Sequence, residues 1–135
     1  MTVKLKDQTQ DILMYSKVMA LSDVEICKYI AEIEGLSTYV QSGSVRVMVT
    51  DGDDYYFNPL TDNNQLIFIM IKHEVERDFE HYDVIGWGYN VLDGKNPIRV
   101  TERQDFDDPV QPDLSMQKAV CLAIILNKSE DFKLS

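Results

Sequence analysis

Apolar residues dominate one stretch near the end of the chain, Leu114–Leu126, and no charge occurs between Ala119 and Leu126. A stretch of this length without Gly or Pro is ordinary for a helix and long for a strand. Asp113 can cap its start, and Asn127-Lys128 offers a polar end with a cation near the negative helix terminus. About two turns that are apolar all round must be covered on most sides. The pattern therefore predicts a buried core helix.

A second helix is predicted from Asp23 to Glu34. Ser22 and Glu25 have the spacing of a capping box, in which each side chain accepts a hydrogen bond from the other residue's backbone N–H. Gly35 supplies a left-handed stop. Apolar residues recur at helical spacing on one face, namely Ile26, Tyr29, Ile30 and Ile33. Charged residues are expected to face water, namely Glu25, Lys28, Glu32 and Glu34.

After Leu36 the hydrophobic period changes to two, which is typical of strands. Val45, Val47 and Val49 alternate with other residues, and Ser42-Gly43 before them is a turn of the hairpin type. Pro59 ends a later strand because proline cannot donate a ladder hydrogen bond. The strands predicted in this way are Ser37–Val40, Ser44–Thr50, Tyr55–Phe57, Val84–Val91 and Ile98–Thr101.

The run Leu66–Lys72 fits a helix and a buried strand almost equally well. Its β-branched and aromatic residues favour a strand, whereas the Asx-rich entry Asp62–Gln65 and the basic end Lys72-His73 favour a helix. The residues alone leave both open. The next segment, His73–His81, is polar and is interpreted as a charged face.

The length of 135 residues suits one domain with a core of its own. Short turns between the predicted strands favour antiparallel pairing, because parallel strands need a crossover connection. We therefore predict an α+β domain over residues 21–135, with one mainly antiparallel sheet of about three to five strands packed against the two helices. Residues 1–20, with a possible short helix at Asp11–Ala20, are predicted to be an N-terminal extension.

Acidic residues outnumber basic ones by 23 to 13, which gives a formal net charge of −10. This charge repels phosphate backbones and anionic lipid surfaces, and no two basic residues are adjacent. We expect no direct binding to DNA or RNA and no binding to membranes. The sequence also lacks an apolar run of ~20 residues and a signal-peptide h-region, so the cytoplasm is the expected location. Cys27 and Cys121 lie among apolar residues and are expected to be reduced and buried.

Candidate metal and catalytic residues lack recognised spacings. Asp51, Asp53 and Asp54 share one turn, but no EF-hand loop follows, so a solvated turn is favoured. His81 and Asp83, with His73, have the types of metal ligands without a known pattern. Cys121 lacks the neighbours of a nucleophile, and no phosphate loop or catalytic order is present. We expect no catalytic, metal or cofactor site. Packing in the core and strands is the favoured role of the remaining aromatic residues considered, Tyr55, Tyr56, Tyr82, Trp87 and Tyr89.

Three stretches together suggest a family. Ser22–Lys28 reads Ser-Asp-Val-Glu-Ile-Cys-Lys, Phe57-Asn58-Pro59 precedes an Asn-rich entry to an apolar stretch, and Pro112-Asp113-Leu114 leads into a helix rich in Ala and Ile. In these features, from Leu21 to Lys128, the chain resembles the NinX-like proteins of lambdoid phages and prophages. The resemblance implies an α+β domain of phage or prophage origin with no catalytic residues to carry over. It also favours a helix for Asp62–Lys72.

Three functional hypotheses follow. The first is a non-enzymatic phage accessory protein that binds a protein partner in the bacterial cytoplasm. The second is a DNA mimic, whose carboxylates imitate a phosphate row and occupy a basic nucleic-acid site. The third is a small enzyme that uses His73 or His81 with a neighbouring carboxylate. The possible interaction surface consists of Glu74, Glu76, Asp78, Glu80, Asp83, Asp105, Asp107 and Asp108.

Overall fold

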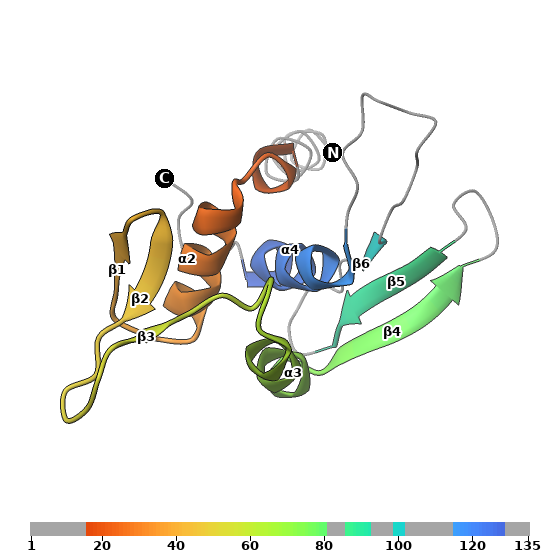
Figure 1. Ribbon diagram of the computed structural model, residues 1–135. Helices are drawn as coiled ribbons and strands as arrows, with labels where there is room; N and C mark the ends of the chain where they lie inside the picture. Colours follow the sequence, from red (N-terminus) through yellow and green to blue (C-terminus); the bar gives the residue numbers. More distant parts are fainter. Residues whose placement is uncertain (1–15, 81–85, 93–98, 102–114, 129–135) are drawn as a thin grey trace, which may run out of the picture.

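Helix α4 lies in the middle of the computed structural model, with one small sheet beside helix α2 and another against α4 itself (Figure 1). The structure describes residues 16–80, 86–92, 99–101 and 115–128. Both sheets are three-stranded and antiparallel, with the orders β1-β2-β3 and β4-β5-β6. The predicted α+β class is confirmed. The elements are α2 (Asp23–Ile33), β1 (Thr38–Gln41), β2 (Ser44–Val47), β3 (Tyr55–Tyr56), α3 (Asn63–Lys72), β4 (Val75–Glu80), β5 (Gly86–Val91), β6 (Arg99–Thr101) and α4 (Met116–Lys128).

The prediction of one sheet is wrong, because β2 and β3 belong to the first sheet and β5 belongs to the second. The chain leaves the first sheet at Phe57, whose N–H donates to the carbonyl of Val45 at 2.9 Å. Helix α3 then intervenes before β4 begins. Each sheet packs on its own helix, with α2 against β1 and β2 and with α4 against β5 and β6. Each sheet thus buries one face without being joined to the other.

The capping box predicted for α2 is present. The N–H of Ser22 donates to Glu25 Oε1 at 3.0 Å, and the N–H of Glu25 donates to Ser22 Oγ at 3.2 Å. The bond from the Ser22 backbone is the main reason that the pKa of Glu25 is lowered. Gly35 has φ +73°, and the next N–H, of Leu36, donates to the carbonyl of Ala31. The predicted start and left-handed stop are therefore confirmed.

The first hairpin turns at Ser42 and Gly43, which have φ values of 53° and 76°. Two successive positive φ angles are the signature of a type I′ turn, which matches the twist of antiparallel strands. The predicted turn is confirmed, but β2 ends at Val47 and does not continue to Thr50. The reason is that Asp54 Oδ1 accepts from the N–H of Val49 at 3.2 Å and so takes this donor away from strand pairing.

Helix α4 is the predicted core helix, and every residue from Ala119 to Asn127 is buried. Its first turn is capped by Ser115, whose Oγ accepts from the N–H of Lys118 at 3.2 Å. The predicted cap, Asp113, lies outside the described residues, as does Leu114. The helix ends at Lys128, with this basic residue in its last turn, as predicted, although Asn127 is buried.

Strand β4 occupies the segment that was interpreted only as a charged face. It pairs with β5 over its whole length, from Val75 opposite Val91 to Glu80 opposite Gly86. In its six residues, Val, Arg and Phe alternate with acidic residues, which is the two-residue period of a strand. The pattern was missed because only two of the six residues are apolar. Strand β4 forms despite its polar composition because its backbone pairs with β5, which carries the buried residues Tyr89 and Val91.

Both cysteines are free and buried, as predicted. Burial raises the pKa of the Cys27 thiol to about 11, and it also raises the pKa of the Cys121 thiol. Val18, in the last part of the predicted N-terminal extension, is fully buried in the same core. None of the described helices combines the length and the apolar character needed to cross a bilayer.

Candidate functional site

Helix α3 carries apolar side chains on both of its sides. Its N-cap is Asp62, whose carboxylate accepts from the N–H groups of Asn64 and Gln65 at 3.0 and 3.2 Å. Leu66 and Ile69 are buried, each with 1% exposure. The run that the residues alone left open is therefore a helix, as the resemblance implied. On the outer side three large apolar residues stay exposed: Ile67 at 51%, Phe68 at 66% and Ile71 at 73%.

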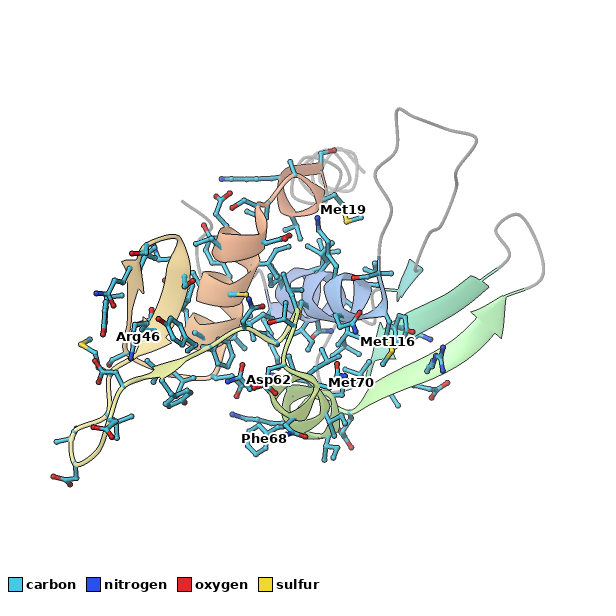
Figure 2. All side chains as sticks on the ribbon, viewed as in Figure 1. Met19, Arg46, Asp62, Phe68, Met70 and Met116 are labelled. Carbon is cyan, nitrogen blue, oxygen red and sulfur yellow. The ribbon has the colours of Figure 1, made fainter. Side chains whose placement is uncertain are left out.

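We call these three residues the α3 face. Ile71 follows Ile67 by four residues and Phe68 by three, so all three lie on one side of the helix. Figure 2 shows Phe68 on the side of α3 that points away from α4, whereas Met70 lies on the side toward it. The inner side of α3 thus packs against the core. The outer side is also apolar but is exposed and does not contribute to the core.

The side chain of Gln65 joins α3 to β3. Its Oε1 accepts from the N–H of Asn58 at 2.7 Å, and its Nε2 donates to the carbonyl of Tyr56 at 2.8 Å. Strand β3 pairs with β2 on one side only, and these two backbone groups lie on its other edge. The amide therefore occupies hydrogen-bonding groups that a neighbouring strand would otherwise use.

A polar cluster joins the ends of α2 and α3. Glu34, the C-cap of α2, accepts from Lys72 Nζ through Oε2 and lies 2.8 Å from His73 Nε2 through Oε1. The side chains of Glu34 and His73 are only 6% and 4% exposed, whereas that of Lys72 is 50% exposed. The prediction that Glu34 faces water is therefore wrong, and His73 does not belong to a charged face. A carboxylate can be buried here because two partners satisfy it.

A cavity of about 390 Å³ lies beside the α3 face. Its polar lining consists of Glu34, Gln65 and Lys72, and each of these side chains is already bonded within the protein. The cavity therefore offers mainly apolar surface, which suits a large apolar group better than a polar metabolite. Its apolar lining consists of Leu36, Tyr55, Phe57, Phe68 and Ile69.

The predicted acidic surface is only partly described. Glu74 is exposed in a turn with φ 52°, and Glu76 is exposed on β4. Asp78 and Glu80 occupy alternate positions further along β4, where they pair with Gly88 and Gly86. The described part of the chain contains no group of three or more side chains placed to hold a metal ion. The remaining predicted residues lie outside the described ranges, namely His81, Asp83, Asp105, Asp107 and Asp108.

The acidic turn after β2 uses one of its carboxylates for structure. Asp54 Oδ2 accepts from the hydroxyl of Tyr39 at 2.8 Å, and this bond is the main reason that the pKa of Asp54 is lowered. Asp51 and Asp53 are exposed. This arrangement agrees with the favoured interpretation of a solvated turn, in which one carboxylate organises the backbone.

Three of the aromatic residues expected in the core have described side chains and divide into two groups, whereas Tyr82 and the side chain of Trp87 lie outside the described part of the structure. Tyr89 is fully buried, as expected. Tyr55 and Tyr56 are instead 41% and 59% exposed, because β3 lies at the edge of the first sheet. Tyr55 lines the cavity beside α3, so part of the predicted packing surface belongs to the candidate site.

Comparison of the chain with protein-family models, with curated proteins and with solved structures found no match. The resemblance to NinX-like proteins stays a prediction, and function is argued from the site. Sequence reasoning missed the α3 face, although a signal for it existed. Leu66–Ile71 is an unbroken apolar run, and a helix of this composition packed on one side must expose apolar residues on the other.

The Gln65 contact gives a first prediction. Gln65→Leu removes both side-chain hydrogen bonds to β3, and the freed backbone groups can still reach water. The free energy of unfolding is expected to fall by about 1 kcal/mol, measured by urea denaturation. Asn64→Leu serves as a control, because the Asn64 side chain is exposed one position earlier. An equal loss in the two variants would contradict the role of the Gln65 amide.

Proposed function

We propose that this protein is a non-catalytic binding domain whose α3 face, with the adjoining cavity, contacts a protein partner. The observation that carries the proposal is the exposure of Ile67, Phe68 and Ile71 together on one helix. Single exposed apolar residues are normal, but a contiguous apolar patch beside a cavity is typical of an interaction site. Aromatic and aliphatic anchors that enter such a cavity supply most of the binding energy in protein interfaces.

The buried polar pair beside the cavity and the two buried thiols elsewhere in the core support a role without catalysis. His73 and Glu34 bond to each other between two helix ends, and the imidazole is buried. Burial raises the pKa values of both cysteine thiols, which disfavours the thiolate needed for nucleophilic attack. The resemblance to NinX-like proteins supports a phage or prophage accessory role in a bacterial cytoplasm as the setting of this binding.

A capture experiment with matched variants tests the proposal. Tagged protein is incubated with extract of bacteria that produce it, and bound proteins are identified by mass spectrometry. The double variant Phe68→Ser/Ile71→Ser is expected to lose the partner, because it removes two exposed anchors without opening the core. Val40→Ser is the control, because Val40 is an exposed apolar residue, at 51%, on β1 in the first sheet.

The capture experiment has a clear contrary result. If the double variant retains the same partner as the wild type, the α3 face is not the binding surface. Circular dichroism melts of the double variant are expected to match the wild type to within a few degrees, because exposed substitutions rarely change stability by more than about 0.5 kcal/mol.

A second candidate is the DNA mimic, favoured by the position of β4. This strand lies at the edge of its sheet, and the sequence has Glu76, Asp78 and Glu80 at alternate positions along it. A mimic would bind a basic nucleic-acid-binding protein through these charges. In the capture experiment, Glu74→Lys/Glu76→Lys would then abolish binding, whereas Phe68→Ser/Ile71→Ser would leave it unchanged.

A further inference from the structure

We infer that the partner segment on the α3 face is an amphipathic helix whose apolar stripe is flanked by Lys and Arg. The inference rests on the proposed function and specifies the chemistry of the partner. It combines the backbone hydrogen bonding around the cavity, the charges at the two ends of α3 and the shape of the apolar surface.

Backbone hydrogen bonding favours a helix over an extended strand. The edge of β3 beside the cavity is closed by the two bonds of Gln65 to Tyr56 and Asn58. The backbone of α3 is bonded within its own helix, so neither element offers a row of free N–H and C=O groups. An extended segment would bury its own backbone groups without partners, which costs free energy for each group. A helix arrives with its backbone already bonded.

The length and shape of the surface suit a short helix. Helix α3 has ten residues and is therefore ~15 Å long. A partner helix of about three turns can lie along it and present apolar residues at i, i+3, i+4 and i+7. The cavity of about 390 Å³ beside Phe68 can receive one large apolar side chain from this stripe. Because Glu34, Gln65 and Lys72 are bonded inside the protein, an apolar anchor leaves fewer unpaired polar groups than a polar one.

Charges at the two ends of α3 favour a cationic partner. Asp62 is exposed at the start of α3, and Glu74 and Glu76 are exposed just beyond its end. Lys72, the basic residue of the helix, is paired with Glu34. Lys and Arg beside the partner's apolar stripe would face these carboxylates, whereas Asp and Glu would be repelled. A second copy of this chain fits less well, because two molecules of net charge −10 repel each other.

Selection from a displayed library of random 15-residue peptides tests the inference with the full chain as the target. Enriched peptides are expected to carry apolar residues at helical spacing with Lys or Arg beside them, and to become helical on binding. Affinity of the best peptide, measured by fluorescence anisotropy, is expected to fall at least about tenfold for Phe68→Ser/Ile71→Ser, because these side chains are the anchors. Val40→Ser is expected to change it less than about twofold.

The outcomes separate this inference from the proposed function. Peptides that need Phe68 and Ile71 but are extended or acidic overturn the cationic helix and leave the proposed function standing. Peptides that bind equally well to the double variant overturn the inference, and the capture experiment then decides the proposed function by itself. Absence of any enriched peptide also overturns the inference. The last outcome concerns sedimentation of the protein alone. A dimer that is lost in Phe68→Ser/Ile71→Ser would mean that a second copy of this chain covers the α3 face, and it would overturn the inference.

Discussion

Replacing Ile30 with Asp is expected to abolish cooperative folding at room temperature. Ile30 is fully buried on the side of α2 that packs against α4 and the first sheet. The substitution removes about 1.5–3 kcal/mol of apolar burial and adds a buried carboxyl whose desolvation costs several kcal/mol more. Domains of this size are stable by only about 5–15 kcal/mol, so the sum is a large part of the total. The measurement is a thermal melt followed by circular dichroism.

Two variants of the same helix calibrate this result. Glu32→Asp introduces Asp on the exposed side of α2 and is expected to lower the free energy of unfolding by a few tenths of a kcal/mol. Ser22→Ala removes one half of the capping box and is expected to cost about 1 kcal/mol. If Ile30→Asp shifted the melting temperature no more than Ser22→Ala, the buried face of α2 would be misassigned.

The elements that could be predicted from sequence are those in which local signals agree. The capping box at Ser22, the helical stripe through Ile30 and the stop at Gly35 all indicate α2, and the structure contains each of them. A half-exposed helix carries polar residues on its outer face. The uncharged run after Lys118 has none, so it indicates a buried helix. Ser42-Gly43 fixes the first hairpin through backbone conformation, which depends little on the rest of the fold.

The features that were missed depend on contacts between distant segments. Strand β4 is polar in composition and exists through its pairing with β5. Whether the strands form one sheet or two depends on where α3 lies between them, which periodicity does not specify. Glu34 and His73 are 39 residues apart in sequence, so neither local pattern shows that they meet. The α3 face was hidden for the same reason, because only the packed structure shows which side of an apolar helix is covered.

The contact between Glu34 and His73 gives the second large prediction. Glu34→Ala is expected to lower the free energy of unfolding by about 2–4 kcal/mol, because it leaves a buried imidazole without this acceptor. The same variant frees Lys72, but that side chain is half exposed and can be hydrated, so its share is small. Lys72→Ala is therefore expected to cost less than about 1 kcal/mol. Urea denaturation of the two variants measures both values, and comparable losses would assign the effect to the salt bridge.

A double-mutant cycle isolates the pair itself. Glu34→Leu leaves His73 facing an apolar side chain, and His73→Leu leaves a largely buried carboxylate that still bonds to Lys72. When both are replaced, neither polar group remains to be desolvated without its partner, so the double variant is expected to lose less than the sum of the single losses by about 1–2 kcal/mol. The stability of all four proteins is measured under the same conditions. Additive losses would mean that the two side chains do not interact, and the ends of α2 and α3 would then be joined by the bond between Glu34 and Lys72 and by apolar packing.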